Sequence, residues 1–218
     1  MELVIGLTIA ILLGFYIAFR PTYNRAPRII WTYWEEPDHL DPYKRMTEKA
    51  KANIEGWRAL NPSYKIVILT KKTYHGYVTI PEDMHPELRD TSPYFSSLLK
   101  LWTLAEHGGV WLDPNVALMA PLDNWMFPKY AECSLLLSDH TLESWFIACN
   151  KKSTFLQKWR DEFSTIRRHP NVEKYVESRT PHAAHPIQVA AEMVLGPYPK
   201  ESLIRWREDE CSRMIRVT

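Results

Sequence analysis

The pattern of apolar and polar positions predicts short buried strands that alternate with amphipathic helices. Continuous apolar runs bounded by turn residues are typical of strands that are covered on both faces. Runs of this kind occupy residues 28–34, 65–69, 110–112, 134–137 and 145–149, with two closing candidates at 203–206 and 214–217. Apolar residues three to four positions apart predict helices at 43–60, 94–107 and 153–168, and a weaker helix at 182–195 that Pro186 breaks.

The order of these elements predicts the fold class. Strands and helices alternate along the chain, and this arrangement favours an α/β fold with a mostly parallel central sheet flanked by helices. Proline-rich and acidic stretches at 35–42 and 81–93 predict loops, and Gly108-Gly109 ends the helix before residues 110–112. The chain has neither a GxGxxG motif nor a P-loop, so it lacks the usual signals of Rossmann dehydrogenases and P-loop NTPases.

The first twenty residues form a segment distinct from the rest of the chain. Residues 3–19 carry no charge, and as a helix they would span about 25 Å, which is at the short end for a bilayer crossing. A cleaved signal peptide is the rival interpretation, but it would want a basic start and a small-residue cleavage site. Arg20, Arg25 and Arg28 follow the apolar run and no cation precedes it, so the positive-inside rule predicts a single-pass anchor with the catalytic part in the cytoplasm. We therefore expect an anchor at 1–20, a linker at 21–27 and one catalytic domain at 28–218.

Composition narrows the choice of partners. The 27 basic and 26 acidic residues give a formal charge of +1, which offers no electrostatic case for a nucleic-acid partner. The three cysteines show no CxxC spacing, so neither a disulfide framework nor a zinc site is indicated. Nine Trp and eleven Tyr supply flat faces that suit sugar rings and nucleobases, and they suit an ordinary core equally well.

Candidate chemistry lies at Asp113-Pro114-Asn115, directly after the predicted strand 110–112. Ligands of open α/β sheets bind at the carboxyl ends of strands. Two oxygen-bearing side chains beside a stiff proline can face one hard cation, Mg²⁺ or Mn²⁺, which often takes only one or two protein ligands and completes its shell with substrate phosphates. On spacing alone, an ordinary Asx-turn that closes a strand explains the same residues.

Three blocks of sequence resemble the DXD-type glycosyltransferases, a group that includes the family-32 enzymes and the capsular polysaccharide synthesis proteins. Residues 95–113, FSSLLKLWTLAEHGGVWLD, resemble the core signature of the group. Residues 28–34, RIIWTYW, resemble its opening strand, and residues 57–66, WRALNPSYKI, resemble its linker. The blocks occur in the family's order and cover about residues 27–125.

The resemblance implies a GT-A fold, which is Rossmann-related, together with a nucleotide-sugar donor, a divalent metal and retention of anomeric configuration. UDP-sugars are favoured over GDP-sugars, and the acceptor is expected to be a glycan or polysaccharide of the cell surface or capsule. Position by position, Asp113 matches the first DXD aspartate and Asn115 matches the second, the direct metal ligand. Trp31 matches the aromatic that stacks on the base, with Thr32 and Tyr33 beside it.

Three positions depart from the family pattern. Asn115 replaces a carboxylate, Ser97 stands where the family has an aspartate, and Lys100 stands where it has an arginine. Ser97 can still hydrogen-bond a ribose hydroxyl, and Lys100 can meet a phosphate as a point charge. These changes permit either an active transferase or a catalytically inactive, nucleotide-sugar-binding subunit that supports a partner transferase.

Three further polar clusters lie beside predicted elements. Asp139 follows the strand 134–137, so it is a second candidate catalytic residue that would reach the acceptor or the sugar hydroxyls; a simple polar loop after a strand explains it too. His182 and His185 flank a break between two prolines and would touch the diphosphate, or else they are exposed histidines at a helix start. Glu35 lies in an acidic cluster that follows the first strand and is a candidate for the donor edge.

Overall fold

The computed structural model of the chain describes residues 26–35, 46–81, 94–125, 131–138, 141–179, 185–198, 203–207 and 213–218. The predicted anchor at 3–19 and the candidate Asp139 lie outside these ranges. Among the helices within them, none combines the length and the apolar character that a bilayer crossing requires.

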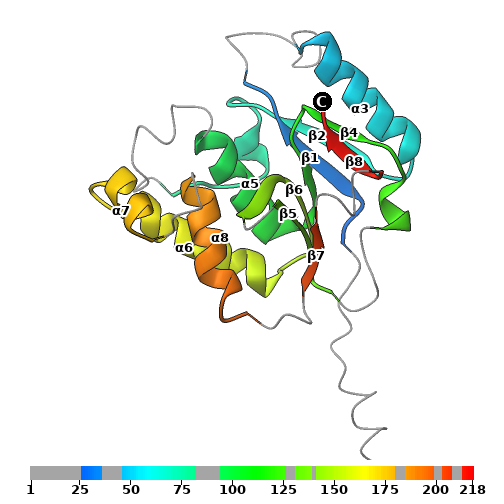
Figure 1. Cartoon of the computed structure of the whole chain (residues 1–218). Coiled ribbons are helices and arrows are strands. Elements are labelled where there is room, and N and C mark those ends of the chain that lie inside the picture. The colour runs from blue at the N-terminus through cyan, green and yellow to red at the C-terminus, as the bar shows by residue number, and fades with distance from the viewer. Residues whose placement is uncertain are drawn as a thin grey trace, which may run out of the picture.

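A six-stranded sheet in the order β2-β1-β3-β6-β5-β7 forms the centre of the domain (Figure 1). Every neighbouring pair is parallel except the two that involve β6, so the predicted mostly parallel sheet is confirmed. The strands are β1 (Ile29–Tyr33), β2 (Lys65–Leu69), β3 (Gly109–Leu112), β5 (Cys133–Ser138), β6 (Thr141–Cys149) and β7 (Leu203–Arg207).

Helices cover both faces of this sheet, which explains why its strands are apolar on both sides. The helices are α3 (Glu48–Leu60), α5 (Tyr94–His107), α6 (Thr154–Arg167), α7 (Val172–Arg179) and α8 (Pro186–Leu195), with short 3₁₀ turns η1 (Tyr74–Gly76) and η2 (Leu122–Asn124). Trp31 and Trp111 belong to the core cluster beneath α5, α6 and α8. Ile30 and Val110 belong to the cluster beneath α3. Successive strand residues thus enter different cores.

The helix α5 is the central helix of the domain. Almost all of its middle turns are buried, from Leu98 to Ala105, because it packs against the sheet on one side and against α6 on the other. Its neighbour α6 begins at a serine cap, where the Ser153 hydroxyl accepts a hydrogen bond from the Leu156 amide. The predicted helices at 94–107 and 153–168 are therefore found with the expected faces inward.

Several predicted boundaries are corrected. Pro186 does not break a helix but begins α8, because the fixed φ of proline and its missing N–H suit the first helical position. No strand was predicted between Asp113 and residue 134, yet β4 (Val116–Leu118) pairs with β8 (Ile215–Val217) in a second, two-stranded sheet. The helix α7 was not predicted at all. The described part of the first helix begins at Glu48, where Thr47 caps it.

Candidate active site

Two glycines set the position of β3 beside β1. Gly108 and Gly109 both have positive φ, 68° and 99°, and they turn the chain from α5 directly into the sheet. A Cβ atom at Gly109 would lie 2.7 Å from the Ile29 carbonyl oxygen, so only glycine permits this approach. The Trp31 indole also donates a hydrogen bond to the Gly108 carbonyl at 2.9 Å. The glycine pair therefore fixes where β3 begins.

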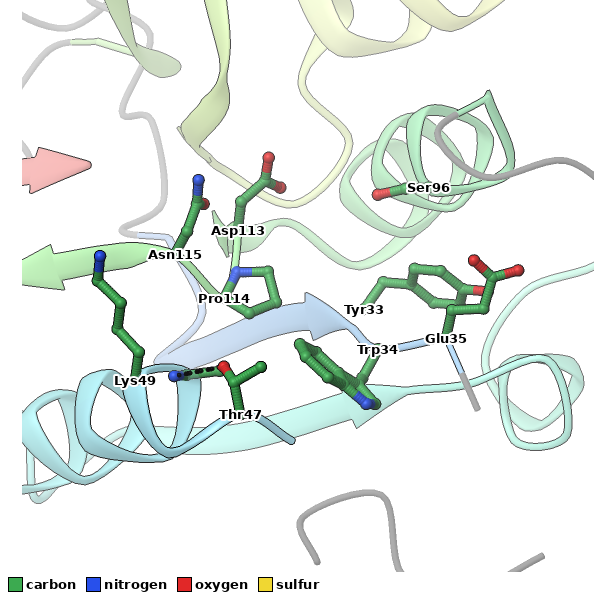
Figure 2. Close-up of a pocket in the computed structure, with 10 residues that line it drawn as sticks. Tyr33, Trp34, Glu35, Thr47, Lys49, Ser96, Asp113, Pro114 and Asn115 are labelled. Carbon is green, nitrogen blue, oxygen red and sulfur yellow. Dashed lines mark hydrogen bonds between the residues drawn. The ribbon is translucent and has the colours of Figure 1, made fainter. Parts of the chain in front are cut away.

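The turn after β3 carries Asp113, Pro114 and Asn115 at the carboxyl end of the strand. Its backbone is held from two sides. The Asn53 side chain of α3 donates to the Pro114 carbonyl at 2.9 Å, and the amide of Thr218 donates to the Asn115 carbonyl at 2.7 Å. The side chains of Asp113 and Asn115 extend to the same side of this turn (Figure 2). The turn is thus a fixed platform for two oxygen-bearing groups.

The carboxylate of Asp113 is held by two donors. The Trp111 indole nitrogen donates to Oδ1 at 2.6 Å, and the Lys100 ammonium lies 3.2 Å from the same oxygen. Lys100 is 3% exposed, whereas Asp113 is 30% exposed and reaches solvent. Burial lowers the pKa of Lys100, and the carboxylates of Asp113 and Glu143 oppose that shift. Both described contacts end on Oδ1, so Oδ2 takes part in neither of them.

A cavity of about 390 Å³ opens on one side of Asp113 (Figure 2). Tyr33, Trp34 and Glu35 line it from the end of β1, and the first turn of α3 lines it with Lys49. Burial, with Glu35 second, raises the pKa of the Tyr33 hydroxyl well above its ordinary value. Within the described part of the chain this hydroxyl has no hydrogen-bond partner. The cavity therefore combines aromatic walls with charged groups, as ligand pockets commonly do.

A second cavity, of about 200 Å³, opens on the other side of Asp113. Lys100 and Ser144 lie in its wall, and His185 lines it from the start of α8. Ser96 and Asp113 line both cavities. Asp113 and Ser96 are consequently shared by the walls of the two cavities.

The structure brings most of the predicted site residues together around these cavities. Tyr33 and Asn115 line the larger one, Ser97 and Lys100 line the smaller one, and Asp113 lines both. Lys100 was expected to meet a phosphate, but its ammonium lies on Asp113. Asp139 lies outside the described residues.

Trp31 and Thr32 lie elsewhere than predicted. Trp31 is 2% exposed and packs against Tyr77 and His107, so its ring is a core element with no face open to a base. Thr32 is 0% exposed. The side chains of β1 alternate between the two cores, and the first aromatic side chains to reach a cavity are Tyr33 and Trp34 at the end of the strand. The predicted base contact, Trp31, is thus buried, and the aromatic residues that line the cavity come two and three positions later.

The prediction from sequence missed three cavity residues and gave little weight to a fourth. Ser96, Ser144 and Lys49 carry no motif, and ordinary surface positions look the same. His185 was noted as a residue beside a helix start, and it is both an exposed cap residue and part of the smaller cavity. Its position before a proline at a helix start was the one available signal.

A cation at this site would have few protein ligands. Among the described residues, no group of three His, Cys, Asp or Glu side chains could hold a metal ion. Asp113 and Asn115 together offer two oxygen ligands on one turn. That set fits a hard cation only where phosphate oxygens complete the shell.

Comparison with known proteins gives the family. The model of the capsular polysaccharide synthesis protein family matches residues 16–176, which is most of the chain. The structure of the PaToxG glycosyltransferase has 14% sequence identity and a TM-score of 0.50, with 91% of this chain and 87% of that chain covered. The glycosyltransferase GlyE of Streptococcus pneumoniae TIGR4 has 13% identity and a TM-score of 0.46, and the chain covers 46% of its length. No curated protein sequence matches this chain.

The match to PaToxG shows a shared fold, and the family match covers the β1, α5 and Asp113 blocks on which the sequence prediction depended. The predicted enzyme class, a glycosyltransferase, is confirmed at this level. This chain belongs to the capsular polysaccharide synthesis protein family.

Proposed function

We propose that the chain transfers a sugar from a nucleotide-sugar donor to a glycan or polysaccharide acceptor, on a GT-A-type domain with Asp113 at the reaction centre. One observation carries this proposal: a carboxylate at the carboxyl end of a central strand stands where two cavities meet. A donor has the same two-part form, because a bulky nucleoside diphosphate is joined to a sugar by the bond that breaks.

The larger cavity suits the nucleoside diphosphate. The half-buried Trp34 ring offers a stacking surface at the end of β1. Lys49 and the first turn of α3 bring positive charge toward the Asn115 side of the cavity (Figure 2). UDP-sugars are the favoured donors in this proposal, because the family resemblance implies them.

A divalent cation, Mn²⁺ or Mg²⁺, would be held by Asp113 and Asn115 together with the donor phosphates. When bound, it would supply charge that stabilises the leaving diphosphate. Trp111 and Lys100 hold the Asp113 carboxylate in one orientation, so its free oxygen faces the ligand without a rearrangement. The amide of Asn115 adds a neutral oxygen ligand, which predicts weaker cation binding than a second carboxylate would give.

The test is turnover of a panel of UDP- and GDP-sugars with Mn²⁺ or Mg²⁺, measured as release of the nucleoside diphosphate. The Asp113→Ala variant should lose at least about 100-fold in rate, since it removes charge and ligation from the developing transition state. Asp161→Ala, an exposed carboxylate on α6 that pairs only with its neighbour Arg160, is the matched control and should retain wild-type activity. EDTA should abolish turnover, and Asn115→Asp should lower the Mn²⁺ concentration required.

The outcomes separate the alternatives. Metal-dependent donor binding by calorimetry without turnover would identify an inactive sugar-nucleotide-binding subunit that acts with a partner transferase. If wild type binds and turns over no donor, and Asp113→Ala behaves in the same way, the proposal fails. Retention is tested by the anomeric configuration of the product.

We further propose that residues 3–19 anchor the enzyme in a membrane with the catalytic domain in the cytoplasm. The cations at Arg20, Arg25 and Arg28 support this orientation. Protease added outside sealed inverted vesicles should digest the domain, whereas protection of the domain would refute the orientation.

A further inference from the structure

The smaller cavity contains a polar wall that a strand irregularity creates. Along β5 and β6, Leu136 pairs with Glu143, but the adjacent Leu135 pairs with Ile147. Residues 144–146 therefore have no partner on β5. Bulges re-aim side chains and are frequent beside active sites. In this case the bulge brings the Ser144 hydroxyl into the cavity wall, 3.5 Å from the Lys100 ammonium.

The opposite wall is formed by the start of α8. His185 occupies the cap position of this helix, yet its side chain makes no capping hydrogen bond. Among the described residues its imidazole has no hydrogen-bond partner, so both ring nitrogens are available to a ligand. The position is rigid, because the Trp159 indole of α6 donates to the Ile187 carbonyl at 2.8 Å within the first turn of α8. The described contacts therefore fix the backbone at the start of α8, and the exposed His185 imidazole is free to meet a ligand.

Apolar side chains complete the lining. Tyr94, Phe163 and Ile187 face the same space as Lys100 and Ser144. A surface with apolar patches and a few fixed polar groups is the usual form of a site for a small organic ligand. A sugar ring matches it, since its C–H faces pack on apolar groups and its hydroxyls need hydrogen-bond partners at the edge. The cavity is about half as large as its neighbour, at 200 against 390 Å³.

We propose that the smaller cavity binds the sugar ring of the donor, and that Ser144 and His185 hydrogen-bond its hydroxyl groups and so determine which sugar is transferred. This inference rests on the proposed transferase function. Because Asp113 joins the two cavities, a donor with its diphosphate in the larger one has its sugar at the entrance of the smaller one. Ser144 and His185 lie outside the larger cavity, so they contribute to recognition of the sugar and not of the nucleotide.

Calorimetry on the full chain with Mn²⁺ tests this separation. The probes are UDP and whichever of UDP-glucose, UDP-galactose and UDP-N-acetylglucosamine the wild type turns over fastest, with GDP and GDP-mannose as the alternative pair. For Ser144→Ala and His185→Ala, the dissociation constant of the UDP-sugar should rise about 3- to 10-fold, the effect of one lost hydrogen bond, while that of UDP stays within about 2-fold. Ser144→Thr should restore most of the affinity.

Two variants provide matched controls. Ser178→Ala lies on the exposed face of α7 and His75→Ala lies on η1, and neither residue lines either cavity. Both should leave the two dissociation constants unchanged. The differences in turnover rate among the donor sugars of the panel should also become smaller for His185→Ala and remain unchanged for His75→Ala.

The possible results distinguish this inference from the proposed function. If the wild type transfers sugar but Ser144→Ala and His185→Ala change UDP and UDP-sugar binding equally, or change neither, the sugar subsite is wrong and the transferase stands. If the variants raise only the KM for the acceptor, the cavity binds acceptor and the inference is overturned. If the wild type binds no nucleotide at all, the proposed function itself falls.

Discussion

The buried pair of Lys100 and Asp113 predicts an asymmetric response to substitution. The Asp113→Asn change keeps the size of the side chain and an oxygen that can accept from the Trp111 indole, but it removes the negative charge. The Lys100 ammonium, 3% exposed, then keeps neutral neighbours, among them the Ser144 hydroxyl at 3.5 Å and the Trp111 ring at 5.4 Å. The field of Glu143 remains, but the adjacent negative charge is lost. A buried cation without its counter-ion is the costly result of such a change.

The magnitude follows from the exposure of each partner. Removing one partner of a fully buried ion pair costs about 3–5 kcal/mol. Because Asp113 is 30% exposed, water already screens part of the interaction, and we expect a loss of about 1–3 kcal/mol for Asp113→Asn. The Lys100→Met change removes the buried cation and leaves Asp113 with solvent and the Trp111 indole. That variant should lie within about 1 kcal/mol of wild type.

Thermal and urea unfolding of both variants at neutral pH measures the difference. For a chain of this size, the expected loss lowers the midpoint of Asp113→Asn by roughly 2–12 °C. Lys100→Met should unfold close to wild type even though both variants lose sugar transfer. Equal destabilisation by the two changes, or a neutral Asp113→Asn, would contradict the idea that Lys100 requires a counter-ion in the folded state.

Three further predictions follow from other features of the structure. In urea unfolding, Gly109→Ala should lower the free energy of unfolding by more than about 1 kcal/mol, because this residue has a positive φ and lies close to the Ile29 carbonyl. Gly56 is an open position inside α3, so Gly56→Ala should raise the free energy of unfolding by about 0.5–1 kcal/mol in the same titration. Trp34→Ala should weaken UDP binding by the loss of a stacking contact worth about 1–3 kcal/mol. Trp31→Phe should lower stability and leave the UDP dissociation constant unchanged in calorimetry. If Trp31→Phe weakened UDP binding and Trp34→Ala did not, Trp31 would be restored as the base contact. Burial lowers the pKa of Lys100 in the folded state below its ordinary 10.5, so between the folded and unfolded pKa values the unfolded state binds more protons. The free energy of unfolding of wild type, measured relative to Lys100→Met, should therefore rise with pH through that window. No change across the window would mean that Lys100 stays protonated in the folded state.

The main helices and strands could be predicted from the sequence because the apolar pattern within each of them already indicates burial. The segments that form β1, β2 and β3 are short apolar runs, and α5 and α6 carry apolar stripes that no solvent-facing segment would keep. The errors occurred where tertiary contacts decide. β4 is only three residues long, and it is a strand because β8 pairs with it from nearly a hundred residues further along the chain. Local patterning cannot reveal such a partner.

Within the site, the sequence located the residues of the recognised motif better than the other residues that line the cavities. Asp113, Ser97 and Lys100 belong to one continuous stretch of helix, glycine turn and strand, so their proximity follows from a local pattern. The error at Trp31 arose because a strand residue and its neighbour face opposite cores. Which aromatic reaches the cavity depends on where the strand ends, and that end lies two residues further on, with Trp34 directly after it.

Ser144 and His185, in contrast, could not be assigned to the smaller cavity in this way, and the reason bears on specificity. Ser144 reaches the cavity only because β6 accommodates three residues that have no partner on β5. His185 reaches it only because α6 anchors the first turn of α8 beside the sheet. Neither residue belongs to the turn that carries Asp113, so a substitution at either one can alter the wall of the smaller cavity while the Asp113 carboxylate keeps its hydrogen bond from the Trp111 indole. Under the proposed sugar subsite, Ser144 and His185, rather than Asp113, are therefore the positions at which a substitution should alter donor choice.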